Sequence, residues 1–199
     1  MKNMNLNLAK TIFPNPSKSI SWNINYKNSY VQFHVAQRNL LARPFRKIEG
    51  EFKVYTGFMQ TIAEDFTDAA IDFSVIVNSI NTGNEKRDKH LKSKDFFDVE
   101  QFPLMKFHSV SFEKERAGVY ILEGNCTIRG IIKRLVFDVV YDGTKLDEFG
   151  NTIAVFKAAT TINRHDFGIK STMLAEIFIE KEVTIALNLE FIEMDIRIW

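Results

Sequence analysis

Residues 183–191 read VTIALNLEF, and this stretch decides the fold class. Apolar residues occupy every second position, namely Val183, Ile185, Leu187, Leu189 and Phe191. Successive side chains of a β-strand point to opposite faces, so this spacing predicts a strand with one apolar side and one side turned to water. The second side carries the polar residues Thr184, Asn188 and Glu190.

The same period of two recurs along most of the chain. It is clear in residues 29–36, 48–54, 71–78 and 135–141, and weaker in 119–128 and 152–162. The four clear segments carry these apolar faces: Val31, Phe33 and Val35; Ile48, Phe52 and Val54; Ile71, Phe73, Val75 and Val77; Leu135, Phe137, Val139 and Tyr141. Residues 104–112 are ambiguous, which a β-bulge near Ser109 would explain. Turns are expected at the intervening glycines, Gly118, Gly130, Gly143 and Gly150. The pattern predicts an antiparallel meander of about eight strands.

Two segments depart from this alternation. Residues 82–94 are rich in charge, and Thr82 followed by Glu85 is typical of a capping box, which predicts a short helix. Residues 171–181 carry Met173, Leu174, Ile177 and Phe178 at helical spacing, and they fit a short helix or an irregular loop with one buried face. Because no long helix is available to cover a sheet, the apolar faces must meet each other in a sandwich or a closed barrel.

The composition narrows the class of protein. Eighteen Phe residues against five Tyr and two Trp give the chain much apolar surface to bury. The formal net charge of +1 argues against a broad grip on nucleic acid. The one cysteine, Cys126, excludes an internal disulfide and any cysteine-rich zinc site. Residues 1–21 lack the apolar core of a secretion signal, so we expect a cytoplasmic protein.

Four segments in this order resemble the YceI-like, polyisoprenoid-binding family. They are residues 22–24 (WNI) with 29–35 (SYVQFHV); 79–84 (SINTGN) with 87–93 (RDKHLKS) and 95–98 (DFFD); 102–103 (FP) with 107–109 (FHS) and 124–130 (GNCTIRG); and 156–158 (FKA) with 162–168 (INRHDFG). The resemblance covers about residues 21 to 192. It implies an all-β fold, an extended eight-stranded antiparallel lipocalin-like barrel with one or two short helices. Many members of the family are periplasmic, which is the alternative location.

The resemblance also implies a division of the chain and a use for its interior. We expect a polar leader over residues 1–20, the barrel over 21–193 and a short tail over 194–199. An elongated apolar cavity would bind, store or transport an isoprenoid-type lipid, such as a polyprenyl chain or a quinone precursor. The residues expected to line it are Val31, Phe33, Val35, Phe52, Phe73, Val75, Phe107, Phe137 and Phe156. The alternative is that these side chains interlock as a solid core.

Arg87 and His90 are the candidates for the mouth of the cavity. With Leu91 they share one face of the predicted helix, where they could meet a polar or phosphorylated head group. The alternative is structural: Arg87 pairs with a nearby carboxylate and His90 donates to a backbone carbonyl, so that the helix closes one end. The string that contains Arg164, Asp166 and Gly168 is expected to fix a turn, with Asp capping backbone amides and Gly at a positive φ.

No catalytic set is recognisable, so we expect a binding protein and not an enzyme. The histidines lack metal spacing, and Cys126 fits a small buried hydrophobe better than a nucleophile. We therefore expect no cofactor and no metal, only a bound isoprenoid-type lipid. Two alternatives stay open. One is an isomerase or hydrolase that uses His108 or His90 on an apolar substrate, and the other is a filled-core structural or interaction protein.

The expected partner is an isoprenoid or fatty lipid, with no nucleic acid. A basic stretch surrounds three large apolar residues and could touch an anionic membrane surface transiently, or it is a solvated loop near the barrel entrance. It comprises Arg38, Arg43, Arg46 and Lys47, with Leu40, Leu41 and Phe45. The sequence leaves open whether the protein is a monomer or a homodimer.

Overall fold

The computed structural model describes residues 19–37, 46–170 and 179–194. Within them, ten β segments and one α-helix follow one another along the chain. The strands are β1 (Ile20–Gln37), β2 (Arg46–Phe52), β3 (Tyr55–Thr61), β4 (Ala70–Ile76), β5 (Ile80–Asn81), β6 (Leu104–Arg116), β7 (Val119–Ile128), β8 (Ile131–Leu146), β9 (Thr152–Asn163) and β10 (Ile179–Met194). The helix is α1 (Glu85–Lys92), and two 3₁₀ turns are η1 (Val77–Ser79) and η2 (Arg164–Phe167).

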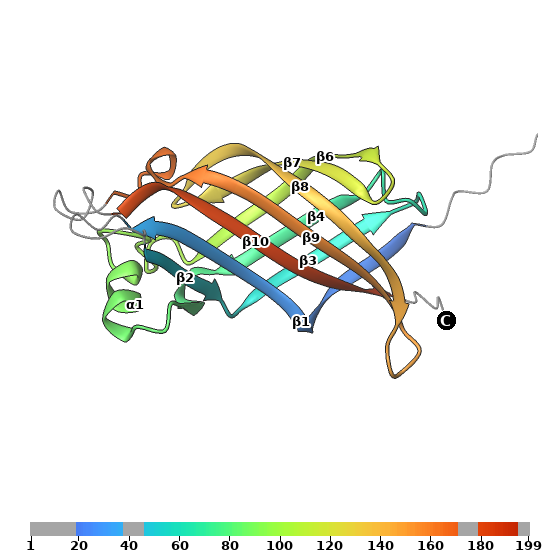
Figure 1. Ribbon diagram of the computed structural model, residues 1–199, viewed down its shortest axis with the longest axis horizontal. Coiled ribbons are helices and arrows are strands. Elements are labelled where there is room, and N and C mark those ends of the chain that lie inside the picture. The colour runs from blue at the N-terminus through green and yellow to red at the C-terminus, as the bar shows by residue number, and fades with distance from the viewer. Residues whose placement is uncertain (1–18, 38–45, 171–178, 195–199) are drawn as a thin grey trace, which may run out of the picture.

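The sheet closes on itself, because β10 pairs antiparallel with β1. β2 and β3 pair with successive halves of β1 and act as one interrupted strand, and η1 similarly interrupts the strand made of β4 and β5. The described chain therefore forms a closed eight-stranded antiparallel barrel, which confirms the predicted fold. The barrel is elongated, and its strands cross the long axis obliquely (Figure 1).

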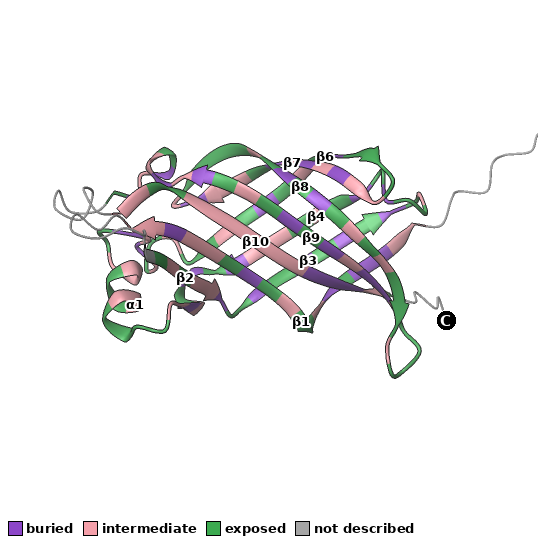
Figure 2. Cartoon of the chain, in the orientation of Figure 1, coloured by how far each residue is buried: buried purple, intermediate pink, exposed green. Residues whose placement is uncertain are grey.

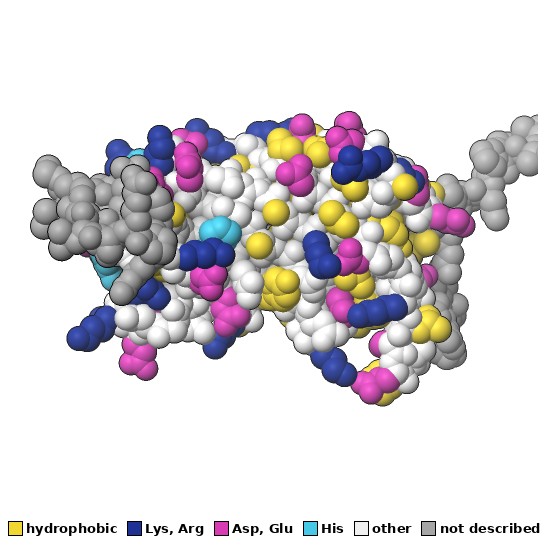
Figure 3. All heavy atoms as spheres, in the orientation of Figure 1, with side chains coloured by type: hydrophobic (Ala, Val, Ile, Leu, Met, Phe, Trp, Pro, Cys, Tyr) yellow, Lys and Arg dark blue, Asp and Glu magenta, His cyan; other side chains and the backbone are white. Residues whose placement is uncertain are grey.

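The alternation of side chains explains why this sequence closes into a barrel. Along β3, β7 and β9, buried and less buried residues follow each other almost without a break (Figure 2). The outer face carries charges of both signs, with apolar side chains between them (Figure 3). Closure pairs the edge of β1 with that of β10, so neither strand offers an unpaired edge there. No helix in the described residues is long and apolar enough to cross a membrane.

Several strand boundaries differ from those expected. The strand predicted over 48–54 ends at Phe52, and Val54 is exposed instead of sharing its apolar face. β3 was not predicted, because its inward face contains Gly57 and Thr61 while Phe58 points outward. Gly118, Gly130 and Gly150 lie at turns, as expected. The prediction of a turn at Gly143 is wrong. A β-bulge falls there, and β8 continues to Leu146.

The other local predictions have mixed outcomes. A bulge does fall between Ser109 and Ser111 in β6. The helix after β5 exists, but its N-cap is Asn84 and not Thr82, because the Asn84 side chain accepts from the Arg87 amide. A second helix or loop was expected over 171–181, but residues 179–181 begin β10, and 171–178 lie outside the described residues. So do 1–18 of the leader, 195–199 of the tail and 38–45 of the basic stretch. Lys47 is described, and it pairs with Glu49 at 2.9 Å.

One end of the barrel is sealed by aromatic side chains. The loop over residues 62–69, between β3 and β4, turns inward and buries Phe66 against Trp22 and Tyr141. Asp68 holds the loop in place by accepting hydrogen bonds from the Thr61 hydroxyl and from the amides of Ile62 and Ala63. These aromatic side chains therefore close this end of the barrel.

Candidate functional site

The rest of the barrel encloses a cavity of about 310 Å³. An apolar cavity of roughly 150 Å³ stays dry and binds benzene, so this one exceeds what a small guest needs. Its wall on β10 extends from Ile179 to Phe191, roughly 41 Å of strand at about 3.4 Å per residue. The cavity is thus long for its volume, a shape that suits a single chain.

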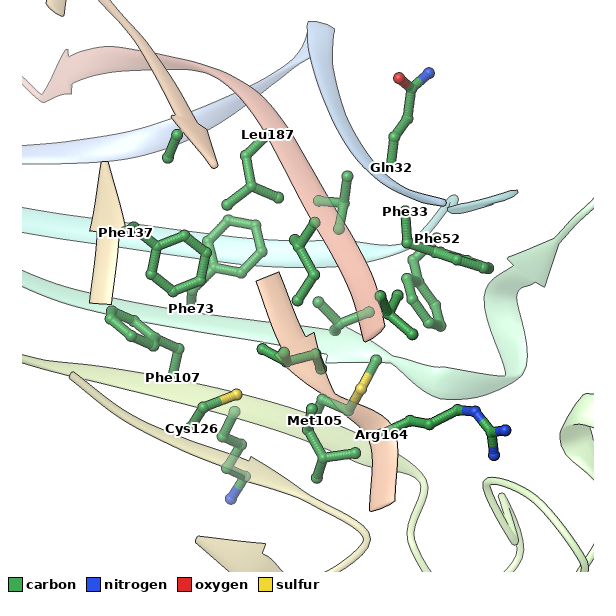
Figure 4. A pocket seen from close by; sticks show the side chains of 18 of the residues that line it. Gln32, Phe33, Phe52, Phe73, Met105, Phe107, Cys126, Phe137, Arg164 and Leu187 are labelled. Atoms are coloured by element: carbon green, nitrogen blue, oxygen red, sulfur yellow. The ribbon is translucent and has the colours of Figure 1, made fainter. Parts of the chain in front are cut away.

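All nine residues expected to line a lipid cavity lie in its wall. They are Val31, Phe33, Val35, Phe52, Phe73, Val75, Phe107, Phe137 and Phe156. Figure 4 shows five of them with Leu187 around one shared space. The side chains do not interlock across the barrel, so the solid core that the sequence left open is not what the structure shows for this part of the interior.

Further wall residues were not selected from the sequence. Ile185, Leu187 and Leu189 belong to the alternating stretch that predicted β10, so the same pattern would have found them. Met59 comes from β3, the unpredicted strand, and Phe97 comes from the turns that follow α1. Met59 was missed with its strand, whose inward face also holds Gly57 and Thr61. Phe97 carries no periodic signal, because a loop residue reaches the lumen only through the tertiary fold.

α1 lies at the open end of the barrel, near β2 (Figure 1). Its residues Arg87, His90 and Leu91 all contribute to the cavity wall, as their shared helix face predicts. Arg87 does not pair with a carboxylate: its Nε and Nη2 donate to the hydroxyl and carbonyl oxygens of Thr82, each at 2.7 Å. His90 packs its ring against that of Phe96, with centroids 5.5 Å apart. The helix is therefore fixed to Thr82, directly after β5, and to the turns that follow the helix.

Arg164 is the one charged wall residue that is fully buried among the described residues, at 4% exposure. It donates to the backbone carbonyl oxygens of Ile169, Ile179 and Glu180, so it fastens η2 to the start of β10. This matches the structural role expected for the turn.

The turn itself differs in one detail. Gly168 has the expected positive φ, and Phe167 is buried. The side chain that caps the turn belongs to Asn163, whose oxygen accepts from the His165 amide, and not to Asp166, which is exposed. The prediction placed the cap at Asp166, but the cap is Asn163. Asn and Asp are both favoured as caps, so residue type did not distinguish them.

Of the groups considered for chemistry, His90 and Cys126 line the cavity and His108 does not. His108, offered for an enzymatic alternative, lies on the outer face, where its Nδ1 bonds to Asp72. Cys126 does face the cavity (Figure 4), but burial raises the pKa of its thiol to about 11, so the thiol is protonated near neutral pH. Across the described ranges, no three His, Cys, Asp or Glu side chains gather as a metal site would require.

A closed antiparallel barrel around an apolar lumen belongs to the class of small barrels that enclose a ligand-sized space. Comparison with known proteins narrows this class. The model of the YceI-like domain matches residues 22–191, and the chain belongs to this family.

Two curated relatives are both described only as UPF0312 proteins. The protein of Pseudomonas syringae pv. syringae is 32% identical over 123 residues, which span 62% of this chain and 64% of that relative. The protein SA2479 of Staphylococcus aureus is 30% identical over 149 residues, which span 73% of this chain and 84% of that protein. The chain thus covers less than two thirds of the Pseudomonas relative.

Solved structures share the fold at low identity. BcnA of Burkholderia cenocepacia has a TM-score of 0.71 and 18% identity, with 84% of this chain and 98% of that chain covered. The YceI protein of Campylobacter jejuni has a TM-score of 0.67 and 24% identity, with 79% and 92% covered. A polyisoprenoid binding domain from Saccharophagus degradans has a TM-score of 0.65 and 11% identity, with 88% and 99% covered. At these identities the likeness shows the fold alone.

Proposed function

We propose that this barrel binds an isoprenoid-type lipid chain in its lumen, for storage or transport, without chemical conversion. The observation that carries the proposal is the long apolar cavity of about 310 Å³ that runs from α1 to the aromatic seal. The Saccharophagus degradans domain, described as polyisoprenoid binding, has the same fold and supports this choice of ligand.

Burial is sufficient as the binding mechanism. Transferring an apolar chain out of water gains about 0.8 kcal/mol per methylene, so a chain of many carbons binds without any polar contact. Because the gain depends on area and not on direction, the wall discriminates poorly between chains of similar length.

The polar end of the ligand is proposed to meet α1. Arg87 and His90 lie in the wall at that end, and Arg87 is held in place by Thr82. A guanidinium can bind a phosphate or hydroxyl oxygen through its remaining N–H groups. The chain would then enter tail first and extend toward the seal.

Native mass spectrometry of gently purified protein tests the proposal. We expect a species heavier than the chain alone, with the added mass of a lipid that organic solvent extracts. Delipidated protein should take up added geranylgeraniol. Protein that purifies empty and also ignores geranylgeraniol would refute the proposed function.

Two neighbouring alanines provide matched variants. Ala158 points into the cavity, whereas Ala159, the next residue on β9, is exposed on the outer face. Ala158→Phe places a ring in the lumen and is expected to abolish geranylgeraniol uptake, while Ala159→Phe should bind as wild type does. Circular dichroism checks that both variants are folded. Equal uptake by two folded variants would place the ligand elsewhere.

A further inference from the structure

Three glycines on the inner face of the barrel lie directly beneath phenylalanine rings that line the cavity. Gly50 and Phe33 are cross-strand partners, as are Gly57 and Phe73. The third pair, Gly124 and Phe107, lies beside the bulge in β6. All three rings belong to the wall of the cavity. The three glycines do not, because the rings lie between them and the lumen.

The rings occupy the space that a side chain on each glycine would need. A Cβ on Gly57 would lie 2.8 and 2.9 Å from two ring atoms of Phe73. A Cβ on Gly50 would lie 2.4 Å from the ring tip of Phe33, and one on Gly124 would lie 2.2 Å from that of Phe107. Distances under 3.0 Å require something to move.

Glycine in the interior of a strand weakens the strand and commonly marks the close approach of another group. Here the approaching group is the same in all three places, a Phe ring from the neighbouring strand. The neighbouring inward positions carry ordinary side chains, for instance Tyr55 and Met59 on either side of Gly57. The glycines thus coincide with the rings and not with turns.

We propose that these three pairs set the width of the lumen and thereby select its ligand. Each glycine lets a large ring lie against the barrel wall instead of projecting toward the axis. The lumen stays open although its wall is rich in Phe, and it admits a single slender chain such as a linear polyprenyl. The inference rests on the proposed function and names the residues that determine its specificity.

Gly57 gives the cleanest test. Its Cβ would come under 3.0 Å of Phe73 alone, whereas one on Gly50 would also crowd the Thr82 methyl and one on Gly124 would meet the His108 carbonyl oxygen at 2.5 Å. We would compare the wild type with Gly57→Ala, Phe73→Leu and the double variant. Xenon occupancy in pressurised crystals measures the free space, because apolar cavities bind xenon. Native mass spectrometry measures geranylgeraniol affinity.

Gly57→Ala should reduce xenon occupancy beside Phe73 and weaken geranylgeraniol binding roughly tenfold, as expected for losing burial of about two methylenes. The double variant should regain both, because Leu leaves room for the new methyl group. Gly50→Ala with and without Phe33→Leu repeats the comparison at an independent pair.

The inference is overturned if Gly57→Ala leaves both measurements unchanged, or if the double variant is as impaired as the single one. Should Gly57→Ala alone fail to fold, the double variant must fold and hold xenon, and a double variant that does not fold also overturns it. A wild type that purifies empty and ignores geranylgeraniol defeats the proposed function, while the xenon series still decides whether the glycines set the width.

Discussion

The ring of Phe66 packs edge-on against the ring of Phe156, with centroids 5.2 Å apart and an interplanar angle of 87°. Phe156 lines the cavity and Phe66 does not, so this contact is the floor of the lumen. Phe66 has a φ of 63°, in the left-handed region that large side chains rarely adopt. The hydrogen bonds that Asp68 accepts and the burial of the Phe66 ring hold the loop in this conformation.

Phe66→Ala is expected to remove the ring that closes the end of the cavity at Phe156. Loss of a buried phenylalanine costs about 3–5 kcal/mol of unfolding free energy, measured by urea denaturation. The variant should also accept longer polyprenyl chains than the wild type in native mass spectrometry. Phe149→Ala is the control, since Phe149 is 81% exposed and its loss should change stability by less than about 0.5 kcal/mol. A Phe66→Ala variant as stable as this control would show that Phe66 seals nothing.

Glu190 is expected to stabilise the barrel closure. Its carboxylate is buried and accepts from Lys145 at 2.6 Å and from the side-chain amides of Asn25 and Asn28, each at 3.1 Å. Glu190→Gln should cost about 1.5–3 kcal/mol, the range for hydrogen bonds to a charged group. Glu148→Gln removes an exposed partner of Lys27 and should leave the denaturation midpoint unchanged. Equal effects of the two substitutions would contradict the account.

Cys126 reports on the interior, because it is the one cysteine of the chain. Burial raises the pKa of its thiol to about 11, which lowers the thiolate population near neutral pH roughly a hundredfold. Folded protein should therefore react slowly with a charged disulfide reagent, while protein unfolded in guanidinium reacts at once. The stability linked to this thiol should be present at neutral pH and decline as the pH rises toward 11. Rapid labelling of the folded protein near neutral pH would contradict a buried thiol.

Asp68 should make the sealing loop sensitive to acid. Burial on its own would raise the pKa of this carboxyl, but hydrogen bonds from Thr61 and from the amides of Ala63 and Ile62 hold it below the ordinary value. Its contribution to stability is thus present above the ordinary Asp pKa and lost as the pH falls through the lowered one. Asp68→Asn should cost about 1 kcal/mol near neutral pH, because water still reaches the side chain.

The comparison of melting temperatures across pH checks this prediction. The difference between wild type and Asp68→Asn should shrink as the solution is acidified. Asp138→Asn, on the outer face of β8, should follow the wild type throughout. A wild-type advantage that persists in strong acid would exclude Asp68 as the group responsible.

Alternation along the chain was enough to predict most of the barrel, because half-buried strands carry their own period. It predicted β7 at Val119–Ile128 within the observed bounds. It failed at β3, where the inward face needs Gly57 to make room for Phe73. A glycine adds no apolar side chain to the alternating pattern. Neither β3 nor the width of the lumen could therefore be predicted from the sequence.

The candidate site shows the same limit. Much of the apolar wall could be predicted, since strand residues such as Ile185, Leu187 and Leu189 alternate with outward neighbours. The partners of Arg87 and the cap at Asn163 could not, because several polar side chains nearby would have served equally well. The orientation of His108 could not be predicted, because a bulge follows it in β6 and interrupts the alternation. The structure places His108 on the outer face.

A crystal structure of the wild type grown with geranylgeraniol tests the central claim most directly. The account predicts continuous density for one chain inside the barrel, passing between Phe137 and Leu187 and ending at Phe156. Density confined to the outer surface, or a barrel whose own side chains fill that space, would contradict it.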